Sequence, residues 1–213
     1  MEFLPQTLND LGWARIVDAW ADRCATLRGM AAVRAHQFLP TPAQAHERMA
    51  AIAEARRLRA EDAAVPLGGI DDIVPALERV RRSAALEAAE LIAVAKTGRA
   101  LAALRKHLRA HEVKAPRLAA GGAAIADLGH VFLPILDAFD ADGRLVDHAS
   151  DALGPLRRAR AAIAAQLERR MKDLLEDERF ASYLQDSYYT QRDDRYVLPV
   201  RTDGKGFVGG IVH

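Results

Sequence analysis

The chain has 213 residues, half of them apolar, and a formal net charge of +1. This length suffices for one sizeable hydrophobic core or two small ones, as in an ordinary globular protein. A strongly basic net charge would indicate binding to nucleic acid, and this chain has none. Any site for a polyanion must therefore come from basic residues that cluster locally. A single cysteine, Cys24, excludes an internal disulfide and a multi-thiolate metal site, and we expect it to be a buried small hydrophobe.

Membrane and export signals are missing from the sequence. No stretch approaches the roughly 18–20 uninterrupted apolar residues that span a bilayer. The N-terminus MEFLPQTLND has neither the basic start nor the apolar run of a signal peptide. We therefore expect a cytoplasmic protein without a membrane partner. Arginine greatly outnumbers lysine, which either a GC-rich coding bias or phosphate recognition would produce.

The N-terminal region has a helical pattern. Apolar residues recur at three- and four-residue spacing over residues 8–36, which predicts one or two amphipathic helices with Gly12 and Gly29 as weak points. Residues 41–44, TPAQ, combine an N-cap threonine, a proline at the first helical position and a glutamine three residues after the cap. A helix is therefore expected from there to about Glu61.

The middle of the chain alternates loops and helices. Residues 65–70, VPLGGI, predict a packed loop, after which Asp71 or Asp72 is expected to cap a short helix that ends near Arg82. A long helix is expected over residues 86–111.

Beyond that helix, proline and glycine interrupt the pattern. Over residues 115–142 they predict short helices, with breaks at Pro116, Gly121-Gly122, Gly129 and Pro134 and a last helical residue near Phe139. Residues 140–143, DADG, predict a tight turn.

The longest periodic segment follows. It begins at Ser150, or near Gly154 because Pro155 is tolerated only in a first turn, and it extends to about Tyr183. Such a helix is about 40 Å long at 1.5 Å per residue. A narrow apolar stripe over that length favours a partner helix, in this chain's dimer or elsewhere, over burial in a compact core. The residues of this stripe that we expect to meet the partner helix are Ile163, Leu167, Met171 and Leu174, and we call them the α-stripe.

Composition changes after Gln185. β-forming residues over 188–200, turn residues over 202–206 and a second apolar run over 207–212 predict a β-hairpin. Pro199 is expected to take an edge or bulged position in the first strand.

The search for catalytic chemistry gives only negative expectations. Residues 204–210 contain glycines and a lysine but not the order of a phosphate-binding loop, and the chain has no G-x-S-x-G motif. His107 and His111 have the spacing of helical metal ligands but lack the glutamate of a zinc-protease helix, so we interpret them as a solvated helix end. Residues 140–147 lack the ligands of a calcium loop. We expect no catalytic residue, no metal site and no cofactor site in this chain.

Positive charge and aromatic rings meet only around the predicted hairpin. Side chains of this kind suit contact with phosphates, without base-specific readout. A plain solvated surface explains the group equally well, since Asp193, Asp194 and Asp203 nearly cancel the charge. The candidate nucleic-acid-binding residues are Arg192, Arg195, Tyr196, Arg201 and Lys205.

A succession of short motifs runs along the chain in a fixed order: PLGGI (66–70), D-x-x-S (147–150), YLQD (183–186), YT-x-R (189–192), RYVLPVR (195–201) and GGIVH (209–213). The block RYVLPVR followed by GGIVH is the most specific of them. This succession resembles the N-terminal region of the bacterial MutS-two subfamily, the MutS-like proteins associated with suppression of recombination.

The resemblance implies a mainly α fold within a protein several times longer, of which this chain is the first part. Residues 1–150 are then a helical core like MutS domain III, residues 151–184 a lever helix, and residues 185–213 a hairpin that begins a DNA clamp. ATP and magnesium binding, through a Walker A loop, and endonuclease activity, through a Smr domain, are implied for other parts of the full-length protein.

Three functional hypotheses follow. The first is a non-catalytic core, lever and clamp segment of a homodimeric protein that suppresses homologous recombination by acting on branched or duplex DNA, and the resemblance also allows action on ribosomal RNA. The second is a helical scaffold or dimerisation module with no nucleic-acid binding of its own. The third, an enzyme with an unrecognised site, has no convergent acid, base or metal ligands in its favour.

Overall fold

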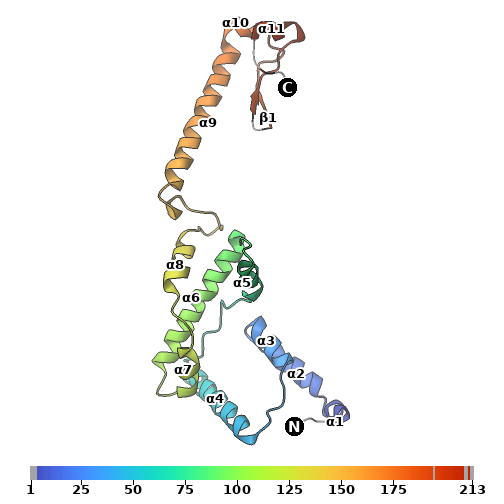
Figure 1. Ribbon diagram of the computed structural model, residues 1–213, viewed down its shortest axis with the longest axis vertical. Helices are drawn as coiled ribbons and strands as arrows, with labels where there is room; N and C mark the ends of the chain where they lie inside the picture. Colours follow the sequence, from blue (N-terminus) through green and yellow to red (C-terminus); the bar gives the residue numbers. More distant parts are fainter. Residues whose placement is uncertain (1–3, 194, 209–210, 212–213) are drawn as a thin grey trace. The chain divides into compact units, whose positions relative to one another are not determined.

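The computed structural model describes residues 4–193, 195–208 and 211. Two compact units divide the chain, Met1–Val146 and Asp147–His213. Helices dominate both units, and within the described ranges the sheet is a two-stranded hairpin in the second unit (Figure 1). The prediction of a mainly α fold with a β-hairpin near the C-terminus is therefore confirmed.

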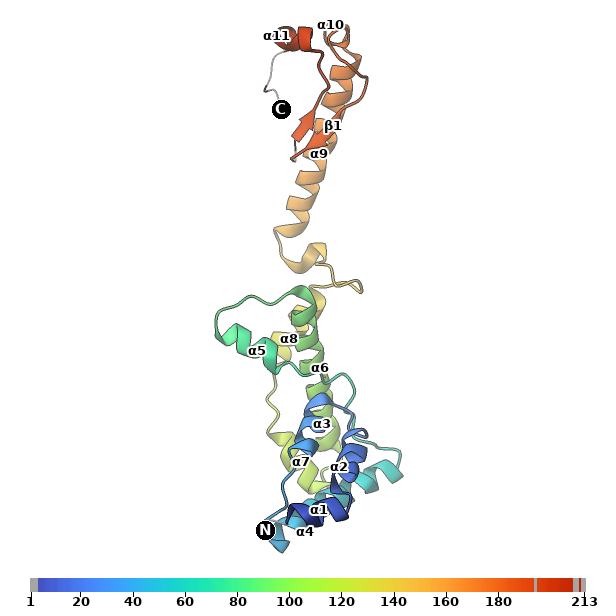
Figure 2. The ribbon, with the colours of Figure 1, turned by 90° about the vertical axis from the view of Figure 1, so that its right-hand side faces the viewer.

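The first unit is organised around one long helix, α6, against which α7 and α8 pack, while α4 contacts α7 and α2 contacts α3 (Figure 2). Its helices are α1 (Pro5–Asp10), α2 (Trp13–Ala21), α3 (Leu27–Arg34), α4 (Pro42–Ala60), α5 (Val74–Arg81), α6 (Ala88–Ala110), α7 (Pro116–Ala123) and α8 (Gly129–Asp137).

The N-terminal helices correct one predicted break. Gly12 separates α1 from α2 in a left-handed conformation with φ of 61°, as its weak-point position predicts. The prediction for Gly29 was wrong, because this residue lies inside α3. The hydroxyl of Thr26 caps α3 by accepting a hydrogen bond from the Gly29 amide at 3.0 Å, and such a cap offsets the cost of one helical glycine. Cys24 is half-buried, not fully buried as expected.

The middle elements follow the sequence closely. Helix α4 begins at Pro42, and the Thr41 hydroxyl accepts a hydrogen bond from the Gln44 amide at 3.3 Å. The 65–70 segment is a loop. Thr97 of α6 holds the residue that follows it, because the Thr97 hydroxyl accepts a hydrogen bond from the Asp71 amide at 3.1 Å. Thr97 is only 2% exposed. The predictions of α4, of a loop at 65–70 and of α6 are confirmed, but residues 66–69 of the loop are exposed and not packed. The prediction that Asp71 or Asp72 caps the short helix was wrong, because the N-cap of α5 is Ile73.

Helices α5 and α6 are joined by an ion pair between Arg79 and Glu90. The guanidinium of Arg79, which donates a hydrogen bond to the Glu90 carboxylate, lowers the pKa of that carboxyl below its usual range. Glu90 also accepts from the Glu87 amide at 3.0 Å, so one carboxylate both caps α6 and binds α5.

Pro134 lies inside α8, and Gly121 and Gly122 lie inside α7, so the predictions of breaks at these residues were wrong. A proline removes one helical hydrogen bond. Tight packing between α8 and α6 compensates for it: Phe132 is 7% exposed and lies directly over Gly98, where a Cβ atom would meet the ring at 2.9 Å. The predicted turn at 140–143 is confirmed, with Asp140 Oδ1 accepting from the Arg144 amide at 2.9 Å.

The second unit is built on one long helix that ends earlier than predicted. Helix α9 starts at Leu153, which places Pro155 in its first turn and agrees with the later of the two predicted starts. Its 24 residues correspond to about 36 Å, and it ends at Glu176 because Asp177 adopts an extended conformation. Asp177 instead caps the short α10 (Glu178–Ala181), where Arg179 lowers the pKa of its carboxyl.

The hairpin pairs differently from the prediction. Its strands are β1 (Thr190–Arg192) and β2 (Arg195–Val197), both within the single strand expected over 188–200. The chain turns at Asp193, whose positive φ of 47° suits an aspartate. The segment expected as a turn and second strand forms a 3₁₀ turn (Thr202–Gly204) and α11 (Lys205–Val208), and residues 209, 210, 212 and 213 lie outside the described part.

Candidate nucleic-acid interface

Two of the predicted arginines form a cross-strand pair. Arg192 of β1 lies directly opposite Arg195 of β2, next to the turn, and both residues are exposed. Side chains directly opposite each other leave the same face of a hairpin, with Cβ atoms about 4.5–5.5 Å apart, and like charges there destabilise the pairing. The hairpin therefore places two guanidinium groups on one face beside its turn, where Asp193 supplies a negative charge next to Arg192 in the chain.

Tyr196 supports the hairpin through an aromatic contact. It pairs with Gln191 across the strands, and its half-buried ring meets the ring of Tyr189 edge-on, with centroids 5.5 Å apart and planes at 75°. Edge-to-face pairs of this geometry are favourable beyond their buried area. Tyr196 thus has a structural contact next to the arginine pair.

Arg201 and Lys205 lie apart from the hairpin strands. The guanidinium of Arg201 donates to the carboxylate of Asp203 at 3.3 and 3.4 Å, which offsets its charge locally. Its backbone amide donates to the Tyr183 carbonyl at 2.9 Å. Lys205 opens α11, and its side chain lies outside the described part. The structure thus brings Arg192, Arg195 and Tyr196 together on the hairpin and places Arg201 in an ion pair beyond it.

A second set of backbone contacts fixes this segment to the end of α10. The Gln185 amide donates to the Pro199 carbonyl at 2.8 Å, and Leu184 and Val200 form an antiparallel bridge. Gly204 lies against Tyr183, where a Cβ atom would stand 2.8 Å from the tyrosine Cβ. The hairpin consequently runs back beside α9, and does not project beyond it (Figure 1).

The α-stripe is covered only toward its C-terminal end. Ile163 and Leu167 are 59% and 43% exposed, whereas Met171 and Leu174 are half-buried in the part of α9 beside the hairpin segment. An apolar surface therefore remains open on the N-terminal half of the helix.

A hollow of about 480 Å³ lies between the C-terminal end of α9 and the segment that leads into β1. Tyr188 and Tyr189 contribute aromatic surface, and Tyr188 is 55% exposed. The other lining residues are Lys172, Leu175, Glu176 and Ser187.

Comparison with known proteins gives one family. No family model matches the chain. Endonuclease MutS2 of Anaeromyxobacter sp. (strain Fw109-5) is 35% identical over 208 residues, and that of Symbiobacterium thermophilum is 32% identical over 208 residues, each alignment covering 98% of this chain and 26% of the relative. Endonuclease MutS2 of Geobacillus sp. (strain WCH70) is 35% identical over 152 residues, covering 70% of this chain and 19% of the relative.

The chain belongs to the MutS2 family. It spans about a quarter of the length of the first two relatives, at 26% of each. The family resemblance inferred from the motifs is therefore confirmed, and the relatives' name describes proteins about four times as long as this segment.

Two further features bear on this MutS2 segment. In the described ranges no helix combines the length and the apolarity needed to cross a bilayer. The same ranges hold no group of three or more histidine, cysteine, aspartate or glutamate residues placed to bind a metal ion.

His107 and His111 are more integrated than a solvated helix end. His107 is half-buried, and its Nε2 lies 3.1 Å from the Ala63 carbonyl oxygen in the loop after α4. His111 Nδ1 lies 2.8 Å from the His107 carbonyl oxygen, and the two rings are 4.4 Å apart. Because carbonyl oxygens only accept, each ring nitrogen named is the protonated one. The end of α6 is exposed at Arg109, Ala110 and Glu112, as expected, but His107 also joins the helix to the loop after α4.

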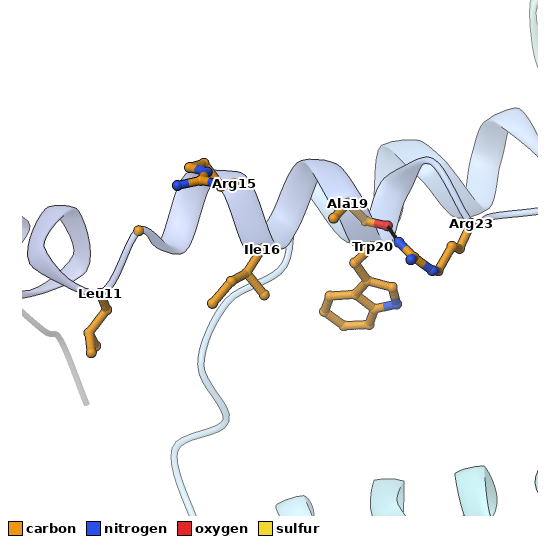
Figure 3. A pocket seen from close by; sticks show the side chains of 7 residues that line it. Leu11, Arg15, Ile16, Ala19, Trp20 and Arg23 are labelled. Atoms are coloured by element: carbon orange, nitrogen blue, oxygen red, sulfur yellow. Dashed lines mark hydrogen bonds between the residues drawn. The ribbon is translucent and has the colours of Figure 1, made fainter.

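The apolar spacing over residues 8–36 predicts an apolar face along α2 and the residues just before it, but not that this face is open. The side chains of Leu11, Ile16 and Trp20 point to one side of the helix, and they are 64%, 50% and 43% exposed (Figure 3). Arg15 and Arg23 border a shallow hollow of about 590 Å³ on this helix. The signal was present in the three- and four-residue spacing, but that spacing alone does not distinguish a covered face from an open one.

Proposed function

We propose that this segment of a MutS2-family protein contacts nucleic-acid phosphates through the hairpin and transmits that contact along α9 as a lever. Under this proposal residues 1–150 are the helical core, residues 151–184 the lever, and residues 185–213 the beginning of the clamp region. The segment itself is non-catalytic.

One observation carries the proposal, the pairing of Arg192 with Arg195 at the exposed turn of the hairpin. Guanidinium groups at an exposed position can donate hydrogen bonds to phosphate oxygens. Such contacts position a protein on a nucleic acid without reading its base sequence. Arg201, Lys205 and Tyr196 are proposed as supporting contacts.

The full-length protein is proposed to be a homodimeric ATPase and endonuclease of the cytoplasm that suppresses homologous recombination on branched DNA, with action on ribosomal RNA as a further candidate. ATP and magnesium would bind outside this segment. Support comes from the motif resemblance and from relatives named Endonuclease MutS2.

The first test measures fluorescence anisotropy of the 213-residue chain on a labelled four-way junction and on a linear duplex. Neutralisation of about four phosphates gives a slope of log affinity against log salt near −3.5 between about 50 and 200 mM salt. Replacing both Arg192 and Arg195 with alanine is expected to weaken binding at least about tenfold at the lower salt and to reduce the slope by about two.

The matched control replaces Arg56 and Arg59, two exposed arginines of α4, with alanine. It removes the same charge from the first unit and should leave the affinity and slope close to those of the unmodified chain. Binding that the hairpin double variant leaves unchanged, or that both double variants weaken equally, contradicts the proposal.

A second candidate function is a scaffold or dimerisation module without nucleic-acid binding. The exposed half of the α-stripe favours it. Apolar association responds little to salt, so the salt slope separates the two candidates.

A further inference from the structure

The hollow beside α9 has the lining of a site for a flat, uncharged ring. Tyr188 presents an exposed ring at its rim, and Tyr189 is held by its edge-on contact with Tyr196 at 5.5 Å. A volume of about 480 Å³ lies within the range of small-molecule sites, about 300–1,000 Å³.

The charges of the lining cancel, so the hollow offers a phosphate no net attraction. Lys172 contributes one positive charge and Glu176, one helical turn later, contributes one negative charge. A carboxylate repels a phosphate, but it accepts hydrogen bonds from the N–H groups on the edge of a nucleobase, and the Ser187 hydroxyl can accept or donate. Phosphates have a better site in the same structural unit, since the cationic pair Arg192 and Arg195 lies next to the turn of the hairpin.

We propose that this hollow receives an unstacked nucleobase, with Tyr188 as the stacking platform and Glu176 and Ser187 as edge contacts. The inference rests on the proposed function, because a base reaches the hollow only on a nucleic-acid strand that this unit binds. Splayed-out bases that stack on aromatic side chains are the usual basis of single-strand recognition in DNA and RNA alike.

The test compares a duplex with the same duplex carrying one unpaired 2-aminopurine, made once in DNA and once in RNA, on the full 213-residue chain. We expect the bulged probe to bind about tenfold more tightly, as stacking of one base allows. Fluorescence of the 2-aminopurine should fall on binding because the ring stacks on tyrosine. The arm with the larger preference identifies the source of the base.

Tyr188→Ala should abolish the preference and the fluorescence change while leaving affinity for the plain duplex intact. Tyr188→Phe keeps the ring and should behave like the unmodified chain. Ser187→Leu adds an apolar side chain at an exposed rim position. This variant should reduce the preference for the bulged probe without removing any packed side chain. It therefore still tests the site if Tyr188→Ala folds poorly.

Failures of the two proposals are separable. Duplex binding that depends on Arg192 and Arg195, combined with equal affinity for bulged and plain probes, overturns the nucleobase site and leaves the proposed function standing. A bulge preference that requires Tyr188 but survives loss of both arginines supports the hollow and contradicts the hairpin as the phosphate contact. A preference retained in Tyr188→Ala also overturns the site.

Discussion

At the scale of single residues, the most consequential group in the first unit is a carboxylate that no local motif announces. Glu54 of α4 is 5% exposed and accepts hydrogen bonds from the Arg117 and Leu118 amides at 3.0 and 3.1 Å. It also accepts from the Arg117 guanidinium at 3.3 Å. These amides belong to the first turn of α7, so Glu54 caps a helix 63 residues away in sequence.

We predict that Glu54→Gln lowers the free energy of unfolding by about 1–3 kcal/mol, because a buried charged acceptor is lost and an amide must fill its place. Urea denaturation followed by circular dichroism measures the change. Glu47→Gln is the matched control: Glu47 bonds the same arginine at 2.8 Å but its side chain is 66% exposed, so an effect within about 0.5 kcal/mol is expected. Equal effects of the two variants would contradict the capping role.

At the scale of elements, glycine determines how closely the helices of the first unit approach one another. Gly122 of α7 is buried against Leu108 of α6, where a Cβ atom would meet the leucine Cδ1 at 2.8 Å and its Cβ at 3.1 Å. Its neighbour Gly121 faces open space within 4 Å. The same residue type therefore has opposite roles at adjacent positions of one helix.

We predict that Gly121→Ala stabilises the protein by up to about 1 kcal/mol through helix propensity, whereas Gly122→Ala destabilises it by about 1–3 kcal/mol by forcing α7 away from α6. The leucine Cδ1 can rotate aside, but its Cβ is fixed to the α6 backbone. Thermal unfolding of the two single variants provides the comparison. Two stabilised variants would show that the α6–α7 contact yields easily.

At the scale of the whole molecule, apolar surface is left open in both units. Leu11 just before α2, Ile16 and Trp20 of α2, and Ile163 and Leu167 of α9 are all exposed by more than 40%. Patches of this kind mark interaction surfaces. The alignment with the first MutS2 relative covers 26% of that relative, which is therefore about four times as long as this chain. Further parts of a protein of that length are one candidate partner for these apolar faces.

For the α-stripe we predict that the isolated chain self-associates or binds an apolar fluorescent probe such as ANS, and that replacing Ile163 and Leu167 with glutamate reduces both. Sedimentation velocity over a range of concentrations and probe fluorescence are the measurements. The control places glutamate at Ala161 and Ala165, two exposed positions of α9 with the same spacing. A monomeric chain that binds no probe contradicts the prediction.

Signals that act within a few residues determined much of this fold from the sequence. The cap and proline at 41–44, the glycine-rich loop at 65–70, the long helix near 86–111 and the turn at 140–143 all appear where the sequence predicts them. Caps, turns and helical periodicity involve neighbouring backbone groups, so the residues themselves carry the information. The ordered motifs likewise sufficed to identify the family.

Tertiary contacts decided the rest. Residues 202–206 have turn chemistry, yet the hairpin turns at Asp193, because the carbonyl of Pro199 accepts from the Gln185 amide and commits the later segment to the end of α10. The capping of α7 by Glu54 depends on residues 63 positions apart in sequence, and the hollow at Tyr188 needs residues 172–176 and 187–189 to meet. A local pattern predicts that a helix face is apolar or that the chain can turn at a residue. Which segment packs against that face or turn is determined only when distant parts of the chain meet.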